Sequence, residues 1–320
     1  MKLGIMMNAF SDRSWADALD AAKNLGFLCV EPGTGGFVGR AHTDVTGMLK
    51  DKSRLEEWVG AVRSRGLQIS AISCHGNPLH PDAKEAGQHL RELEESIEFA
   101  GIIGVDTINC FAGCPGAGED AKYPNWITCP WPPCFGDAVK WQWEKKVIPF
   151  WQKLSASVTG TTIRFALEMH PGDVVYCPET LLMLRDAIGE RVCCNFDPSH
   201  LFWQGINPIT AIRKIGAAIV HCHAKDAKVD PHVTQWRGVL DWKHYSEVPK
   251  RAWTFRTVGY GHGPDFWNDF VSALRLVGFD GVVSIEHEDP LMSATEGMRK
   301  AVKLLLKTLP FESAGKMTWA

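Results

Sequence analysis

Short apolar runs alternate with longer amphipathic segments along almost the whole chain. The apolar runs predict β-strands at 3–7, 27–30, 68–73, 107–111, 164–167, 192–196, 218–221 and 282–285. Between them, apolar residues three and four positions apart predict helices at 14–26, 53–66, 85–104, 140–158, 178–189, 206–216, 265–278 and 295–309. Strand-then-helix units with fully apolar strands indicate a parallel sheet that is covered by helices on its outside. We therefore predict an α/β fold, a single (β/α)8 TIM barrel, with residues 1–320 forming one domain.

Three features interrupt this repeat. Residues 112–137, after the fourth strand, are rich in Pro, Gly and Trp, and residues 224–262 separate the seventh strand from the next helix. Loops of this length in a compact domain are usually functional. In a barrel both emerge on the face that carries the carboxyl ends of the strands, so we expect them to wall a pocket there. The third feature is Pro149, which predicts a kink or a break in the helix at 140–158.

Composition and charge narrow the classes of protein that fit this pattern. The chain has 320 residues, of which 45% are hydrophobic and 22% charged, so it can bury a large core. Its net charge of −3 argues against a protein that binds nucleic acid by neutralising phosphates. No apolar run approaches the roughly 18 residues that a membrane span needs, and MKLGIMMNAFSDRS turns polar too early for a signal peptide. We therefore expect a cytoplasmic protein that binds neither nucleic acid nor membranes.

Ionisable residues gather where the predicted strands end. The fifth to eighth strands end in LEMHPGD, NFDPSH, HCHAKD and SIEHEDP, and these motifs supply one residue each at equivalent positions: Glu168, Asp197, His223 and Glu286. A single carboxylate at a strand end is more often a cap or a salt-bridge partner, but four such residues converging on a barrel axis indicate a metal site. Three carboxylates and one imidazole suit one divalent ion. We expect Mn²⁺, with Mg²⁺, Co²⁺ and Zn²⁺ as alternatives.

These motifs resemble those of the xylose-isomerase-like barrel superfamily, in particular its sugar phosphate isomerase/epimerase group. The resemblance covers almost the whole chain and includes GFLCVEPG, which carries Glu31 at the usual place of a strand-two carboxylate, NPLH and GYGHGPDF. It implies that the four strand-end residues hold the metal and that His200 contacts substrate hydroxyls. It also implies a sugar or polyol-ketone isomerase or epimerase. Glu168 and Glu286 would then remove and return a proton next to a carbonyl, through a metal-stabilised enediolate.

The chain departs from the ketose 3-epimerases of this group at two positions. Those enzymes have a carboxylate six residues after the first metal glutamate and an arginine six residues after the metal histidine, where this chain has Val174 and Val229. His170 lies two residues after Glu168, on the same side of the strand, and is expected to act as an additional acid or base, or else to form a hydrogen bond behind the metal ligands. Further substrate contacts are expected from His75, His200, Lys225, Arg256 and His262.

Other activities fit parts of the same pattern. A metal-dependent β-eliminating lyase of 3-keto-glycosides, a C- or O-glycoside deglycosidase, would begin with the same proton abstraction and then expel a leaving group. The tryptophan-rich loops fit the bulky aglycone of such a substrate. An apurinic-site endonuclease is a lesser alternative, since Asp230 and His232 imitate its Asp-x-His element but the fourth strand ends INCFAGCP without a histidine. A sugar-binding barrel without activity would not need the complete metal set.

The expected ligand is a small sugar or a sugar-derived ketone. GTGGFVG lacks the Lys-Ser/Thr ending of a phosphate-binding loop, so a phosphorylated substrate is not indicated. A homo-oligomer and a small partner subunit both stay open.

Overall fold

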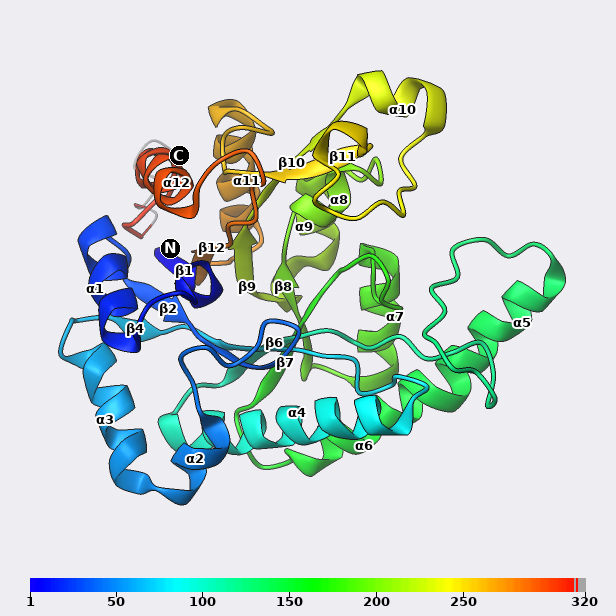
Figure 1. Cartoon of the computed structure of the whole chain (residues 1–320), viewed down its shortest axis with the longest axis horizontal. Coiled ribbons are helices and arrows are strands. Elements are labelled where there is room, and N and C mark those ends of the chain that lie inside the picture. Colours follow the sequence, from blue (N-terminus) through cyan, green and yellow to red (C-terminus); the bar gives the residue numbers. More distant parts are fainter. Residues whose placement is uncertain (314, 316–320) are drawn as a thin grey trace.

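The computed structural model describes residues 1–313 and residue 315, and at its centre lies a parallel β-sheet (Figure 1). The strands are β1 (Lys2–Met6), β2 (Cys29–Glu31), β3 (Gly33–Gly36), β4 (Gln68–Ile69), β5 (Ile72–His75), β6 (Thr107–Cys110), β7 (Arg164–Glu168), β8 (Val192–Phe196), β9 (Ile219–Ala224) and β12 (Val282–Ile285). Their order in the sheet is β3-β5-β6-β7-β8-β9-β12-β1-β2-β4. The last residues of the predicted domain, 314 and 316–320, lie outside the described residues.

The strand order looks open, with β3 and β4 at its ends, because two of the strands are interrupted; the sheet itself closes into a barrel. Pro32, which has no N–H to donate, separates β2 from β3, and residues 70–71 separate β4 from β5. β2 pairs with β4, and β3 pairs with β5. Hydrogen bonds continue across the interruption, from Ser70 N to the Val30 carbonyl and from Ser73 N to the Pro32 carbonyl, each at 3.0 Å. The ten segments therefore form eight strands of a closed ring, and the predicted α/β barrel is confirmed.

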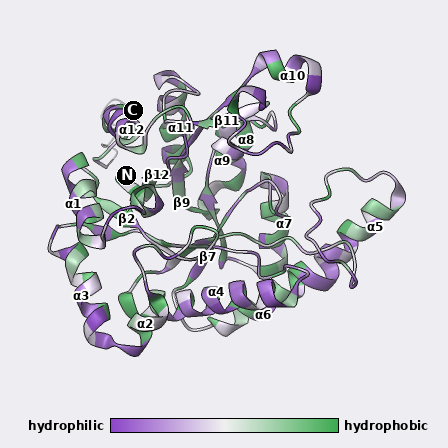
Figure 2. Ribbon diagram, in the orientation of Figure 1, coloured by the Kyte–Doolittle hydropathy of each residue, from purple (hydrophilic) through white to green (hydrophobic). Residues whose placement is uncertain are grey.

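Helices surround this barrel, most of them against its outside and a few, in the long segments after the fourth and seventh strands of the barrel, standing away from it (Figure 1). They are α1 (Trp15–Leu25), α2 (Val45–Lys50), α3 (Lys52–Arg63), α4 (Ala83–Ile103), α5 (Pro133–Trp141), α6 (Ile148–Ser157), α7 (Pro178–Ile188), α8 (Ser199–Phe202), α9 (Pro208–Ile215), α10 (Pro231–Arg237), α11 (Pro264–Leu276) and α12 (Ala294–Thr308). In Figure 2 they carry bands of hydrophilic and hydrophobic residues, as expected of helices with one face on a sheet. None of the described helices has both the length and the apolar character needed to cross a membrane.

Local sequence sets the ends of these helices. The side chains of Ser14 and Asp82 accept N–H groups of the first turns of α1 and α4. Gly26 and Gly104 end the same helices in the left-handed conformation, with φ of 93° and 75°, which a residue with a side chain rarely adopts.

The irregularity predicted at Pro149 is a π-helical segment. Residues Gln142–Val147 form this segment between α5 and α6, and Pro149 is the second residue of α6. A proline has no N–H to donate to the carbonyl group one turn before it, and its ring clashes with that carbonyl. The wider turn of a π-helix accommodates the missing hydrogen bond and the clash.

Two strands run further than the apolar pattern predicts. The strand predicted at 164–167 includes Glu168, and the strand predicted at 218–221 continues to Ala224. The polar side chains at these strand ends, Glu168, His221 and His223, are buried. Because side chains alternate along a strand, His221 and His223 lie on the same side of β9. In the sequence, buried polar residues near the end of a strand therefore make the strand look shorter than it is.

The two long segments differ in structure. Residues 111–132 contain no helix or strand, and α5 begins at Pro133, inside the predicted loop 112–137. The predicted loop 224–262 contains α10 and two antiparallel strands, β10 (Asp226–Val229) and β11 (Trp253–Arg256). We refer to residues 226–256 as the β10–β11 segment.

The β10–β11 segment is built around a hydrophobic cluster that is separate from the barrel core. Trp203, from the end of α8, stacks on Trp253 with ring centres 5.2 Å apart and planes 7° from parallel. The buried members of the cluster are Trp203, Ala227, Val233, Ala252, Trp253 and Phe255. Figure 1 shows α10 standing out from the barrel at the far end of this segment.

Candidate metal centre and active site

Four side chains from neighbouring strands converge at the carboxyl end of the barrel. Glu168 ends β7 and His223 lies in β9, while Asp197 and Glu286 directly follow β8 and β12. One ligand atom of each residue lies within 4.8 Å of those of the other three, and all four residues are buried. Parallel strands present their carboxyl ends at one rim, so residues that are distant in sequence meet there. The structure thus brings together the four residues that the sequence predicts as metal ligands.

The donor set fits a divalent cation. Oδ2 of Asp197 and Oε2 of Glu286 are buried, and among the described residues neither has a hydrogen bond of good geometry, although imidazole nitrogens lie near both. Carboxylates this close to one another repel, and burial makes uncompensated charge costly. Nε2 of His200 lies 3.2 Å from Glu168 and 3.3 Å from Asp197. Burial disfavours the charged form of His200, yet Asp197 and Glu168 outweigh it and raise the pKa of His200 to about 9. The site therefore attracts positive charge, and its oxygen-rich donors suit a hard divalent ion.

His223 is held by carboxylates on both of its ring nitrogens. Nδ1 faces the predicted ion, 3.1 Å from Glu168 and 3.0 Å from Glu286. Nε2 lies 2.9 Å from Oε1 of Glu31, which also accepts a hydrogen bond of 2.8 Å from Nδ2 of Asn109. A carboxylate behind a ligating imidazole fixes its orientation and raises its basicity. Nothing in the sequence pattern points to this contact, because Glu31 and His223 are 192 residues apart.

Lys225 brings a buried ammonium group to the edge of the site. Its Nζ lies 3.1 Å from Oε1 of Glu286 and 2.6 Å from Oε2 of Glu288. The same atom lies 4.2 Å from the centre of the Phe255 ring. Burial opposes the charged form, but Glu286 and then Glu288 outweigh it and raise the pKa of Lys225 well above its ordinary value. Lys225 is therefore charged and holds the Glu286 carboxylate in place.

His170 lies next to the ligands, with its ring centre 4.3 Å from that of His200 and 4.6 Å from that of Phe111. Its Nδ1 is 2.7 Å from the Pro171 carbonyl, an acceptor, so Nδ1 carries the proton. Burial, followed by repulsion from His200, lowers the pKa of His170 well below its ordinary value. His170 is thus a neutral imidazole, whose Nε2 can accept a proton.

Three cavities meet at His170, which lines all of them, and they have volumes of ≈ 350, ≈ 400 and ≈ 370 Å³. We call the one of ≈ 400 Å³ the catalytic cavity, because Glu168 and Glu286 line it. It is also lined by Phe37, His75, Phe111, Lys225 and Glu288. His75 points a ring nitrogen at Glu168, with Nε2 at 3.2 Å from Oε2.

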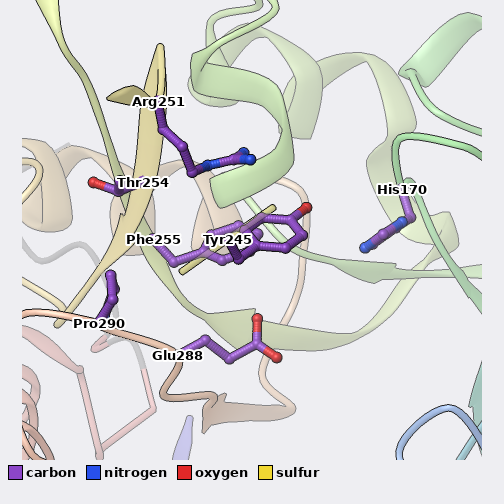
Figure 3. A pocket seen from close by; sticks show the side chains of 7 residues that line it. All are labelled: His170, Tyr245, Arg251, Thr254, Phe255, Glu288 and Pro290. Atoms are coloured by element: carbon purple, nitrogen blue, oxygen red, sulfur yellow. The ribbon is translucent and has the colours of Figure 1, made fainter. Parts of the chain in front are cut away.

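The cavity of ≈ 350 Å³, which we call the side pocket, shares His170 and Glu288 with the catalytic cavity. Its other lining residues come from the β10–β11 segment and from the turn after β12, and they are Tyr245, Arg251, Thr254, Phe255 and Pro290. Figure 3 shows the two aromatic rings at its centre, with Arg251 and Glu288 on opposite sides and His170 across the opening.

Arg256 and His262 are the two predicted substrate contacts that the structure does not bring to the ligands. Nε of Arg256 lies 3.3 Å from Oδ1 of Asp289. His262 stacks on Phe202 at 3.8 Å, and its Nδ1 lies 2.8 Å from Oδ1 of Asp226. Neither residue lines any of the three cavities that meet at His170. Their role in substrate binding stays a prediction.

The sequence pattern did not predict which aromatic residues line the cavities. Phe111 directly follows β6, so its place at a strand end was an available signal. Tyr245 and Phe255 had no signal beyond the number of aromatic residues in their segment.

A protein of known sequence is similar to this chain over almost its whole length. The chain is 36% identical over 313 residues to the Bacillus subtilis (strain 168) protein named uncharacterized protein YfiH. The aligned region covers 97% of this chain and 99% of that protein.

Solved structures share the fold at low sequence identity. The IOLI protein with a binding zinc atom is 18% identical with a TM-score of 0.65, covering 96% of this chain and 98% of that one. The probable 3-DHS dehydratase AsbF, involved in petrobactin synthesis in Bacillus anthracis, is 16% identical with a TM-score of 0.64, covering 96% and 99%. Residues 19–308 match the family described as xylose isomerase-like TIM barrel. The predicted resemblance is thereby confirmed, and the chain belongs to the xylose isomerase-like TIM barrel family.

Proposed function

We propose that the chain is a divalent-metal-dependent isomerase or epimerase of a sugar or a polyol ketone. The observation that carries the proposal is the meeting of four buried ligand atoms within 4.8 Å, beside a cavity of ≈ 400 Å³. A cavity of this size suits a small ligand. Membership of a family of enzymes supports the same conclusion. Mn²⁺ is the ion we propose, because carboxylate-rich sites with a single imidazole favour hard ions.

An ion bound there would act as a Lewis acid that polarises the substrate carbonyl and acidifies the neighbouring C–H group. Glu168 and Glu286 both line the catalytic cavity, and we place one on each face of the substrate. One carboxylate takes the proton, while the electron pair of the C–H bond moves toward the carbonyl oxygen to give an enediolate. The other returns a proton to the opposite face or to the adjacent carbon, and for Glu286 that proton can come from the ammonium group of Lys225, 3.1 Å away.

Neighbouring residues orient this pair of glutamates. Lys225, 3.1 Å from Glu286, favours the ionised form of that carboxylate. His75 and His200 each lie 3.2 Å from an oxygen of Glu168, where their N–H groups can also reach substrate hydroxyls.

The proposal is tested by NMR, following solvent deuterium exchange into a panel of ketoses and inososes. Exchange into recovered substrate or its epimer is expected with added Mn²⁺ and is expected to stop after chelation. Elemental analysis of protein purified without chelator gives the second readout. Absence of both exchange and bound metal would reject the proposal.

Glu168→Gln isolates the acid–base role of that carboxylate. The amide keeps an oxygen for the ion but cannot take a proton, so we expect exchange to fall by about 10²–10⁴-fold while a metal ion is still bound. Glu98→Gln, an exposed change on α4, is the matched control and is expected to exchange like the wild type. Full activity of Glu168→Gln would remove Glu168 from the proposed pair.

One observation favours a second candidate, the β-eliminating lyase of 3-keto-glycosides. His170 is a neutral imidazole that lines the catalytic cavity and is not one of the four ligands, so it can move a proton that the two glutamates do not handle. Nε2 of His170 can take the proton from the carbon next to the carbonyl, and the imidazolium so formed would donate that proton to the departing aglycone. Adding 3-keto-glycosides to the same NMR panel separates the candidates, since a lyase releases the aglycone and leaves an unsaturated sugar.

A further inference from the structure

The side pocket adjoins the catalytic cavity, because His170 and Glu288 line both, and a chain of direct contacts links their walls. Nζ of Lys225 lies 3.1 Å from the Glu286 carboxylate and 4.2 Å from the centre of the Phe255 ring. Phe255 in turn stacks on Tyr245, with ring centres 5.6 Å apart and planes 15° from parallel. Glu288, which contacts Lys225, lines both spaces. A single ligand can therefore lie in both.

The walls of the side pocket are flat and preorganised. Arg251 is only 2% exposed, and its guanidinium carbon lies 4.2 Å from the centre of the Tyr245 ring and 4.8 Å from that of Trp253. Nε of Arg251 donates to the Trp253 carbonyl at 3.2 Å and Nη1 donates to the Lys243 carbonyl, while Nη2 has no hydrogen bond to any described residue. The rings are thus fixed before any ligand arrives, with one guanidinium donor beside them.

We infer that the side pocket binds an aromatic group carried by the substrate, with a hydrogen-bond acceptor on its ring directed at Arg251. This places the substrate among aryl-substituted sugar ketones, and it rests on the proposed function for the position of the ketone at the ion. A flat ring can pack against the exposed part of Tyr245, which is 48% exposed, at the edge of its stack with Phe255. A second sugar would need partners for a full set of hydroxyls, whereas the pocket offers the hydroxyls of Tyr245 and Thr254, one nitrogen of Arg251, and Glu288, which is already paired with Lys225.

Binding of three stable probes tests this assignment without any need for turnover. The probes are 4-nitrophenyl β-D-glucopyranoside, methyl β-D-glucopyranoside and cellobiose, titrated against the full chain after chelation and again with Mn²⁺. Affinity is measured by saturation-transfer difference NMR. We expect the aryl glycoside to bind about tenfold more tightly than the other two, with the strongest saturation on its ring protons.

Two variants and one control locate the binding. Tyr245→Ala removes one face of the stack, and Thr254→Trp fills the pocket; both are expected to reduce the affinity for the aryl glycoside to that for the methyl glycoside. Trp242→Ala is the control, because Trp242 belongs to the same segment, is 90% exposed and does not line the pocket. Circular dichroism verifies that each variant is folded, and with two variants the test does not depend on either one alone.

The outcomes separate this inference from the proposed function. Equal affinity for the aryl and methyl glycosides, equal affinity for cellobiose, or an aryl preference that survives both variants would overturn the inference, even if metal-dependent exchange were observed. An aryl preference that both variants abolish would support it, even if no exchange were found on any ketone.

Discussion

His223 contacts Glu31 through Nε2 and faces Glu168 and Glu286 through Nδ1. An imidazole that binds an ion offers the lone pair of one nitrogen and carries its proton on the other. The proton of His223 therefore belongs on Nε2, where Glu31 accepts it. Glu31 is not one of the four grouped residues Glu168, Asp197, His223 and Glu286, and we expect it to position the histidine.

Glu31→Gln is predicted to weaken Mn²⁺ binding by about ten- to a hundredfold, because an amide accepts the same hydrogen bond without the negative charge that raises the basicity of His223. Isothermal titration calorimetry on the full chain measures the affinity. Glu95→Gln is the matched control, since Glu95 is paired with Arg40 at 2.8 Å on the outside of the barrel. Unchanged affinity in Glu31→Gln would contradict the positioning role.

The sequence allows prediction of the residues at strand ends but not of those that support them. Glu168 and Asp197 stand out because each interrupts an apolar run at the place where a barrel strand should end. Glu31 has the same local signal, yet its meaning depends on a contact with a distant strand. Arg256 and His262, predicted from their position in a long loop, instead contact the carboxylates of Asp289 and Asp226.

Among the elements, β10 organises the turn after β11 through one carboxylate. Oδ2 of Asp226 accepts hydrogen bonds from the backbone N–H groups of Gly259, Gly261 and His262, at 3.1, 3.0 and 2.9 Å. A carboxylate that accepts several backbone N–H groups forms strong, charge-assisted hydrogen bonds. The chain passes close to Asp226 at Gly261, where a Cβ atom would collide with the Asp226 carboxylate and the Ala227 carbonyl.

Gly261→Ala is accordingly predicted to lower the free energy of unfolding by about 1–3 kcal/mol, since the added methyl group forces the turn away from Asp226. Urea unfolding followed by circular dichroism measures the change. The opposite sign is expected for Gly60→Ala, which lies in α3 with open space around its Cβ and should stabilise the protein by about 0.5–1 kcal/mol. A Gly261→Ala variant as stable as the wild type would show that the turn is not packed as described.

Elements with a clear period were predictable, and those that depend on distant partners were not. The strands at 192–196 and 282–285 have the predicted bounds, because each is an apolar run with a single polar residue, Asn195 or Ser284, inside it. β10 and β11 were not predicted, since each is four residues long and they are stabilised by packing around Trp203 and Trp253. The interruption of the second strand at Pro32 could not be predicted, because it depends on the pairing of β2 with β4 and of β3 with β5.

For the molecule as a whole, a bound cation would offset the electrostatic repulsion between the buried carboxylates that the fold brings together at one rim of the barrel. Such an ion binds the folded chain and not the unfolded one, because the four ligands lie on four different strands. We predict that Mn²⁺ at about a hundred times its Kd stabilises the chain by about 2.7 kcal/mol relative to chelated protein, which raises Tm. Differential scanning calorimetry measures the shift, and Asp197→Asn should remove most of it. Equal Tm with and without Mn²⁺ would contradict binding at this site.

The cluster around Trp203 and Trp253 packs apart from the barrel core, while the metal ligands stand on the barrel strands. A mutation in the β10–β11 segment can therefore reshape the side pocket without loosening the strands that carry the ligands. Selection can act on the choice of substrate in one part of the chain and on the reaction in another. If the proposed function holds, a lineage built on this plan can take up new compounds through changes in a single segment while the residues at the strand ends stay the same.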